Sequence, residues 1–156
     1  MIRVEIPGRA PLEITHLALD LNGTLATDGE VPVEIEQRLR ELTSAVAVHI
    51  LTADTFGTAS RFAGLGAQLT VLGPGDQTAT KAAAIRAFGA AHTAAIGNGM
   101  IDEAMLREAA LGILVIGREG AAVRSLLAAD LVVRSIEDAL DLFRFPKRLV
   151  ASLRTG

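Results

Sequence analysis

Short apolar runs alternate along the chain with segments whose apolar residues recur at helical spacing. The apolar runs predict β-strands near residues 2–6, 13–20, 46–52, 68–72, 93–97, 112–116 and 130–134. The segments between them, rich in Ala, Leu, Glu and Arg, predict helices near residues 32–44, 55–64, 77–89, 99–110, 119–128 and 135–143. Such alternation is typical of an α/β fold in which helices cover both faces of a mainly parallel sheet.

Turn-forming residues separate several of these elements. The segment 7–11, with two prolines and a glycine, lies between the first two strands and favours a β-hairpin at the amino end. The dipeptide Asp28-Gly29 predicts another tight turn, and Pro146 should end or kink the last helix. Because the connections are short and the chain has 156 residues, we expect a single domain over residues 1–156.

Composition excludes several classes of function. The net charge of −3 offers no clustered positive surface for nucleic acid, and aromatic residues, at 3% of the chain, are too few for base-stacking platforms. The lack of cysteine removes disulfides, thiolate metal sites and thiol catalysis. No apolar run is long enough to cross a bilayer, so we expect a cytoplasmic protein without membrane partners.

Polar residues stand at the carboxyl ends of four predicted strands. They are Asp20, Asn22, Gly23 and Thr24 after strand 13–20, Thr52 and Ala53 after strand 46–52, Lys81 in the helix after strand 68–72, and Asn98 and Asp102 after strand 93–97. The carboxyl ends of parallel strands share one edge of a sheet, where functional groups collect. These side chains are therefore expected to lie near one another.

Each of these residues has a structural explanation when taken alone. A strand-end Asp or Thr often caps a helix, a single Lys is usually solvated, and Gly-Asn-Gly suits a turn. Their occurrence together favours a joint phosphate and cation site. A carboxylate can act as nucleophile and bind Mg²⁺, while a hydroxyl and a lysine can bind phosphate oxygens.

The segment Asp20-Leu21-Asn22-Gly23-Thr24 resembles the D-x-D-G-T motif of the haloacid dehalogenase (HAD) superfamily, with Asn22 in place of the second Asp. The resemblance implies a three-layer Rossmann-like fold without a cap domain and a reaction through an aspartyl phosphate at Asp20. It also implies Mg²⁺ bound by Asp20, the main-chain oxygen of Asn22 and Asp102, with Asn98 as a further ligand or a group that orients water. Phosphate would be bound by Thr52, Ala53, Lys81, Gly23 and Thr24, helped by backbone N–H groups of residues 21–24.

Two further segments are similar to the phosphorylation domain of P-type ATPases. Residues 50–55 (Ile-Leu-Thr-Ala-Asp-Thr), followed by Thr58-Ala59, are similar to L-T-G-D-N…T-A, and residues 97–106 to G-D-G-x-N-D-A-P-A-L. The likeness covers residues 13–134, without the membrane helices, actuator or nucleotide-binding segment of a pump. The chain thus resembles a small soluble protein built like that domain alone, which leaves open whether ATP is a phosphoryl donor.

Two asparagines depart from these motifs. In HAD phosphatases the second Asp protonates the leaving group and then activates water, which the Asn22 amide cannot do. General acid–base catalysis contributes about 10²–10⁴ in rate, so unactivated esters should turn over slowly and acyl or nitrophenyl phosphates should suffer least. A long-lived aspartyl phosphate, as in P-type ATPases, is also implied. Asn98, where the ATPases carry Asp, should weaken Mg²⁺ binding.

The spacing of the motifs leaves no room for a cap domain. Only 27 residues lie between Thr24 and Thr52, and 28 between Thr52 and Lys81. An uncapped site is open to a large substrate such as a phosphoprotein, or is closed by a neighbouring subunit, as in tetrameric capless members of the superfamily. We therefore expect a phosphorylated substrate, with a macromolecule among the candidates. A homodimer or homotetramer is left open, with strand 2–6 as a candidate assembly edge.

The three histidines do not predict a metal site. His16, His49 and His92 fall near the amino ends or middles of strands, and their spacing supports no zinc site.

The main alternative function is a catalytically weak module that binds phosphate or a partner through the retained fold. A dehalogenase that uses Asp20 against carbon is disfavoured, because Lys81 and the Gly-rich turn indicate a phosphate and metal site.

Overall fold

A computed structural model describes residues 1–53 and 60–155 of the chain. Its centre is a six-stranded sheet in the order β5-β4-β3-β6-β7-β8, in which every neighbouring pair is parallel. The strands are β3 (His16–Asp20), β4 (Ala47–Thr52), β5 (Gln68–Val71), β6 (Thr93–Gly97), β7 (Leu111–Val115) and β8 (Leu131–Val133). The predicted α/β class with a mainly parallel sheet is confirmed.

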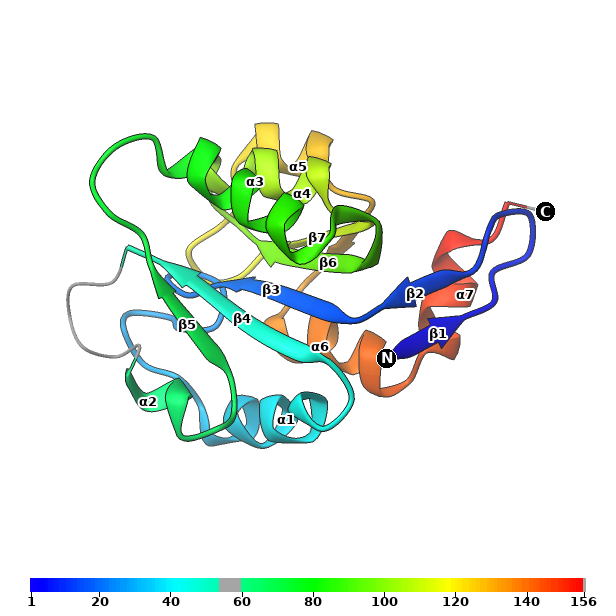
Figure 1. The fold of residues 1–156 in the computed structure, drawn as a ribbon, viewed down its shortest axis with the longest axis horizontal. Helices are drawn as coiled ribbons and strands as arrows, with labels where there is room; N and C mark the ends of the chain where they lie inside the picture. The colour runs from blue at the N-terminus through cyan, green and yellow to red at the C-terminus, as the bar shows by residue number, and fades with distance from the viewer. Residues whose placement is uncertain (54–59, 156) are drawn as a thin grey trace.

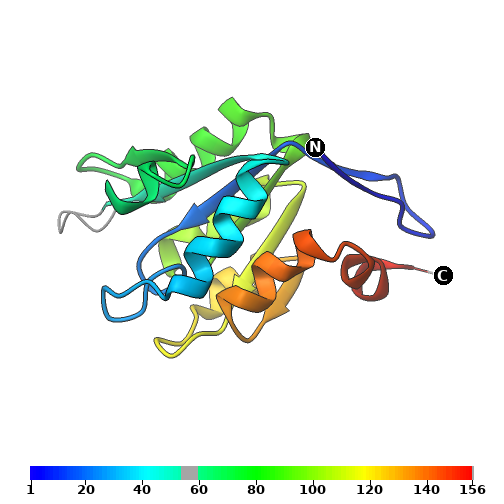
Figure 2. The same ribbon diagram turned by 90° about the horizontal axis from the view of Figure 1, so that it is seen from below.

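Helices cover both faces of this sheet and make three layers (Figures 1 and 2). One face carries α1 (Val33–Thr43) and α6 (Ile136–Arg144), and the other carries α3 (Gln77–Phe88), α4 (Glu103–Glu108) and α5 (Val123–Ala128). Shorter helical pieces are α2 (Ser60–Ala63) and the 3₁₀ turns η1 (Ala90–His92) and η2 (Met100–Asp102). Within the described ranges, no helix combines the length and the apolar character that crossing a membrane requires.

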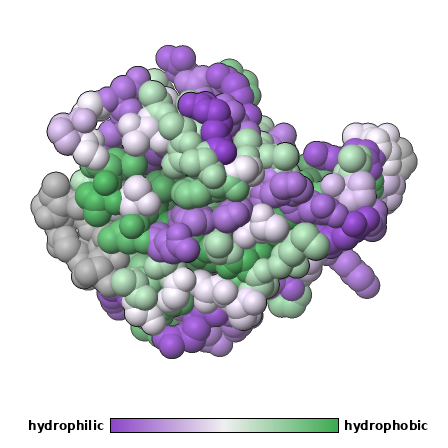
Figure 3. All heavy atoms as spheres, viewed as in Figure 1, coloured by the Kyte–Doolittle hydropathy of each residue, from purple (hydrophilic) through white to green (hydrophobic). Residues whose placement is uncertain are grey.

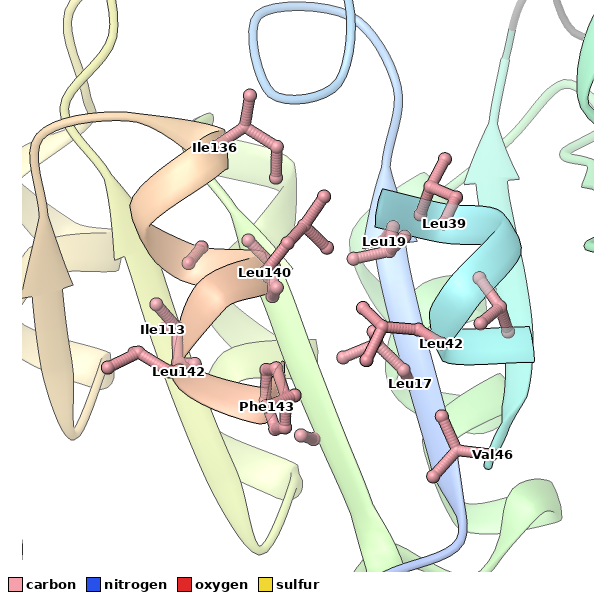
Figure 4. Packing of buried hydrophobic residues seen from close by; sticks show 14 of the residues in the cluster. Leu17, Leu19, Leu39, Leu42, Val46, Ile113, Ile136, Leu140, Leu142 and Phe143 are labelled. Atoms are coloured by element: carbon pink, nitrogen blue, oxygen red, sulfur yellow. The ribbon is translucent and has the colours of Figure 1, made fainter. Parts of the chain in front are cut away.

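The core between the sheet and the α1–α6 layer holds β3 in place. Leu39 and Leu42 of α1 pack with Leu17 and Leu19 of β3, and α6 covers the neighbouring strands (Figure 4). Leu17, Leu19 and Leu39 are completely buried. Each such side chain contributes roughly 1.5–3 kcal/mol through removal of apolar surface from water. The strand that ends in Asp20 is therefore rigidly supported.

An antiparallel hairpin, β1 (Ile2–Val4) and β2 (Leu12–Ile14), forms a second, separate sheet, as the turn residues predict. The single strand expected over residues 13–20 is wrong, because the chain changes sheets at Thr15. Its N–H donates to the His92 carbonyl and its carbonyl accepts a hydrogen bond from the N–H of Ala47, so Thr15 already continues β3 in the large sheet. The hairpin projects beside α7 (Lys147–Leu153), and this end of the molecule is largely polar (Figure 3).

Two other features differ from the prediction, and one predicted helix falls partly outside the described residues. The helix expected over 119–128 begins only at Val123, because residues 117–120 form a turn closed by a hydrogen bond from Gly120 N–H to Gly117 C=O. Pro146 does end the preceding helix but also starts α7, which the pattern did not predict. The helix expected over 55–64 is described only from residue 60, and the Thr58-Ala59 pair lies outside the described residues.

Candidate active site

Asp20 is the last residue of β3, and its carboxylate lies at the centre of the site. Its Oδ1 accepts a hydrogen bond from Lys81 Nζ at 2.5 Å, and its Oδ2 accepts one from Thr24 Oγ1 at 3.1 Å. Burial and the nearby Asp102 carboxylate raise the pKa of Asp20 to about 6, although Lys81 opposes the shift. Contacts to both oxygens hold the carboxylate in one orientation, as an attacking nucleophile requires.

Lys81 reaches this carboxylate from α3. Asp76 precedes this helix as its N-cap, and its side chain accepts a hydrogen bond from the N–H of Ala79. Lys81 is fully buried, and its Nζ also donates to Asp102 Oδ1 at 2.6 Å. Burial disfavours the ammonium, but the two carboxylates outweigh that effect and raise the pKa of Lys81. The side chain is therefore a fixed cation between two anions.

Asp102 closes the turn that follows β6. Its Oδ2 accepts the backbone N–H groups of Asn98 and Gly99, both at 2.9 Å. Gly97 makes room for this carboxylate, since a Cβ at position 97 would lie only 2.6 Å from the carboxyl carbon of Asp102. Gly97 is therefore needed for the close approach of Asp102 to the end of β6.

Thr24 connects Asp20 with the same turn. Its hydroxyl lies 3.1 Å from Asp20 Oδ2 and 3.2 Å from Asn98 Oδ1. A hydroxyl carries one proton and donates to only one of these acceptors at a time. Two oxygens thus face the same small region, which is the kind of donor set that Mg²⁺ prefers. In the part of the chain that the structure describes, no three His, Asp or Glu side chains gather as metal ligands.

Asn22 and Gly23 lie in the turn that leaves β3. Asn22 is exposed to solvent, and Gly23 has φ +80°, a conformation that favours glycine. The N–H groups of Gly23 and Thr24 donate to the carbonyls of Ala26 and Leu21 at 2.8 and 3.2 Å. These two amides are therefore donors within the turn itself, and phosphate binding by the backbone amides of residues 21–24 stays a prediction.

Thr52 ends β4, the strand beside β3. The register pairs Asp20 with Leu51, so Thr52 lies one residue further along the neighbouring strand. Thr52 is buried and Ala53 is partly exposed. Residues 54–59 lie outside the described residues, so the motif at 50–55 is placed only as far as Ala53.

The histidines lie away from this edge, as expected. His16 opens β3, and its Nδ1 lies 2.9 Å from His49 Nε2 in the middle of β4. The ring of Phe88 stacks on His49 with a centroid distance of 3.8 Å. Burial, followed by the influence of His16, lowers the pKa of His49 to about 4. His92 ends η1, before β6 begins.

Glu119 is a residue beside the site that has no counterpart among those predicted. It lies in the 117–120 turn, and its Oε1 accepts the N–H of Asp28 at 3.0 Å. Its Oε2 would lie 2.9 Å from a Cβ placed on Gly23. The Ala-rich pattern placed Glu119 at the start of a helix, and only the glycines at 117 and 120 could have indicated a turn.

A cavity of about 500 Å³ adjoins the site at Gly23 and Thr24. Its walls come from the turn after β3 and from the segments that follow β7 and β8, and they carry both the cationic Arg118 and Arg134 and acidic side chains. Asp20 and Lys81 do not line it. The cavity therefore borders the polar cluster and could hold only a neighbouring part of a ligand.

No protein-family model matches the chain. It is 53% identical to the uncharacterized protein MJ0073 of Methanocaldococcus jannaschii over 60 residues, which are 38% of this chain and 64% of that protein. The chain thus spans slightly less than two thirds of the length of MJ0073. It is 46% identical to the uncharacterized protein MJ0072 of the same organism over 39 residues, 25% of this chain and 89% of that protein.

Solved structures match nearly the whole chain. The cobalt-bound deoxy-D-mannose-octulosonate 8-phosphate phosphatase of Haemophilus influenzae has a TM-score of 0.72 and 21% identity, covering 92% of this chain and 94% of that one. The corresponding Moraxella catarrhalis phosphatase, in complex with magnesium, phosphate and KDO, has a TM-score of 0.70 and 20% identity over 90% and 94% of the chains. A putative HAD superfamily (subfamily III A) hydrolase of Legionella pneumophila has a TM-score of 0.70 and 18% identity over 89% and 86%. The chain belongs to the same family as MJ0072, and its fold is that of the haloacid dehalogenase superfamily.

Proposed function

We propose that the chain is a Mg²⁺-dependent phosphohydrolase or phosphotransferase that forms an aspartyl phosphate at Asp20. The observation that carries this proposal is the Asp20 carboxylate, held between the buried Lys81 ammonium and the Thr24 hydroxyl at the carboxyl edge of β3. Carboxylates oriented in this way act as nucleophiles toward phosphorus. The fold, shared with structures described as phosphatases, supports the proposal.

The reaction would proceed in two displacements. A carboxylate oxygen of Asp20 forms a bond to phosphorus, and the bond between phosphorus and the leaving oxygen breaks. Negative charge spread over the phosphoryl oxygens is met by Lys81 and by the groups at Thr52 and Ala53. The leaving oxygen takes a proton from solvent, since Asn22 has none to give. Water then attacks phosphorus, the bond between phosphorus and the Asp20 oxygen breaks, and inorganic phosphate leaves while the proton of the water passes to phosphate or solvent, which restores the carboxylate.

The oxygens present fit Mg²⁺. In this proposal Asp20, the main-chain oxygen of Asn22 and Asn98 Oδ1 are the ligands. Asp102 already accepts three hydrogen bonds, from Lys81 and from two backbone amides, which suits it to hold the lysine and the turn more than to coordinate directly. When bound, the ion supplies positive charge that neutralises the transferring phosphoryl group.

We infer that the substrate is a small phosphorylated compound. The cavity of about 500 Å³ beside Thr24 has the size of a small-molecule site, and its Arg118 and Arg134 suit a polar or anionic ligand. Between β3 and α3 the described residues form only α1, β4, α2 and β5 with short connections, which leaves no cap domain there. A phosphoprotein is the second substrate class to test. A cytoplasmic location and a homo-oligomer that closes the site belong to the same proposal.

The alternative is a module that binds phosphate or a partner with little turnover. Asn22 favours it, because this exposed amide stands where the resemblance has the acid that completes each cycle. A phosphorylated Asp20 that persists, as the likeness to P-type ATPases implies, is the intermediate case.

The decisive experiment compares wild type with Asp20→Asn in Mg²⁺-dependent hydrolysis of p-nitrophenyl phosphate and acetyl phosphate. Asp138→Asn, an exposed carboxylate on α6, is the matched control. We expect the wild type and the control to hydrolyse both substrates and, with acetyl phosphate, to gain the mass of one phosphoryl group. Asp20→Asn should do neither. Equal rates for wild type and Asp20→Asn would exclude the enzyme and leave the binding module.

A further inference from the structure

Glu119 and Asn98 approach one another around Gly23. A Cβ built on Gly23 would lie 2.5 Å from Asn98 Nδ2 and 2.9 Å from Glu119 Oε2, so both groups crowd the same point. Gly23 has φ +80°, and only the absence of its side chain allows this approach. The turn at 117–120 thus places a carboxylate next to the amide of a proposed metal ligand.

The Asn98 amide has an oxygen side and a nitrogen side in this arrangement. Its Oδ1 lies 3.2 Å from Thr24 Oγ1, on the side of Asp20, whereas its Nδ2 lies 3.5 Å from the carbonyl of Gly120. Glu119 is the neighbour of Gly120 and stands on the Nδ2 side. A carboxylate there attracts the NH₂ group and repels the amide oxygen, which turns Oδ1 toward Asp20.

We propose that Glu119 is a positioning residue that orients the Asn98 amide so that its oxygen faces the cation site. This inference rests on the proposed function and names one of its supporting residues. It also gives a reason for Asn at position 98. An Asp at that position would place its carboxylate beside those of Glu119 and Asp20, with Lys81 as the only cation among the described contacts of this cluster. Asn98 and Glu119 together thus carry one negative charge, as a single Asp at position 98 would.

Glu119 also holds the turn after β3 in place. Its Oε1 accepts the N–H of Asp28, which lies in the tight turn between Thr27 and Glu30. Glu119→Gln keeps an oxygen for this hydrogen bond and removes the charge. The substitution therefore separates an electrostatic effect on Asn98 from a loss of the backbone contact.

The test measures Mg²⁺ affinity by titration calorimetry without substrate, for wild type, Glu119→Gln and the double variant Asn98→Asp/Glu119→Gln. Glu34→Gln, an exposed residue of α1, controls for the loss of one charge. Substitutions in the groups that orient metal ligands cost about 10–100-fold in affinity. We expect Glu119→Gln to bind at least about tenfold more weakly, the double variant to recover to within about threefold of wild type, and the control to match wild type.

A second readout needs neither metal nor activity. In urea unfolding without Mg²⁺, Asn98→Asp should destabilise the protein more when Glu119 is present than in combination with Glu119→Gln. Unchanged Mg²⁺ affinity in Glu119→Gln together with an additive stability cycle would overturn the inference while leaving the proposed function intact. Equal Mg²⁺ binding by wild type and Asp20→Asn would instead overturn the proposed metal site, and the stability cycle would still decide whether Glu119 and Asn98 are coupled.

Discussion

Lys81 Nζ lies 2.5 Å from Asp20 Oδ1, and the lysine side chain has no exposed surface. The same ammonium lies 2.6 Å from Asp102 Oδ1. One buried cation therefore balances two carboxylates. The stability of this cluster depends on the presence of Lys81, Asp20 and Asp102 together. Such groups contribute less net stability than their short distances suggest, but removal of one partner is costly because the others stay buried without compensation.

Lys81→Met should lower the free energy of unfolding by about 3–5 kcal/mol, because it leaves Asp20 and Asp102 facing each other without a cation. Added Mg²⁺ should restore part of this loss if it binds at Asp20. Urea unfolding with and without Mg²⁺ measures both effects. Lys147→Met, at an exposed position of α7, serves as the control and should stay close to wild type. A loss below about 1 kcal/mol for Lys81→Met would contradict the buried ion pair.

Asn22→Asp should raise the steady-state rate on unactivated phosphate esters. The new carboxylic acid can protonate the leaving oxygen and then activate water, a contribution of about 10²–10⁴ in rate. Acetyl phosphate, whose leaving group needs no proton, should gain much less. The ratio of the two rate increases is the measurement, and Asn22→Ser, which keeps a small polar side chain without an acid, is the control. Equal gains on both substrates would contradict protonation of the leaving group and would indicate that the new Asp acts on hydrolysis of the aspartyl phosphate, a step that both substrates share.

The sequence predicted the edge of the sheet where the polar groups meet more reliably than the contacts among them. Asp20, Lys81, Asn98 and Asp102 could be placed because each follows an apolar strand, and parallel strands bring their carboxyl ends together. Their pairing could not be read from the pattern. The path of the turn at residues 97–99 allows Asp102 to accept hydrogen bonds from two backbone amides, and the sequence pattern does not specify that path.

The break in the strand at Thr15 and the turn that contains Glu119 were not predicted, because the local sequence in each place also fits a regular strand or helix. Residues 13–20 were predicted as one strand, and the hydrogen-bond partners of Thr15 show that the chain passes there from one sheet to another. Glu119 precedes an Ala-rich helical pattern, so its place in a turn was not predicted. Both cases are decided by hydrogen bonds to residues distant in the sequence, which local periodicity does not record.

Gly97→Ala tests the close approach of Asp102 to the end of β6. The added Cβ would lie 2.6 Å from the carboxyl carbon and from Oδ2 of Asp102, so the carboxylate must move away from the backbone amides that it accepts. We expect a loss of about 1–3 kcal/mol in the free energy of unfolding, as for other overpacked positions, together with loss of activity. Gly73→Ala is the matched control, because a Cβ there meets nothing within 4 Å and the backbone conformation suits alanine. Similar stabilities for the two variants would show that the turn has room for a side chain.

His49→Phe should remove part of the loss of stability in acid. The pKa of His49 is lowered to about 4 in the folded protein, whereas an unfolded chain has its ordinary value of 6.5. Between these two values the unfolded state binds more protons, so the free energy of unfolding falls as the pH falls from about 6.5 to about 4. Asp20, with its pKa raised to about 6, acts in the opposite direction over part of this range, but it is present in both proteins and cancels in the comparison.

The measurement is urea unfolding of wild type and His49→Phe at about pH 7 and about pH 4.5, where the shift corresponds to about 2 kcal/mol for one group. Phe is chosen because it can keep the stacking with Phe88 while carrying no titrating nitrogen. His92→Gln, at an exposed position, is the control for the loss of one imidazole. If His49→Phe loses as much stability in acid as wild type does, the buried His49 is not a source of the acid sensitivity.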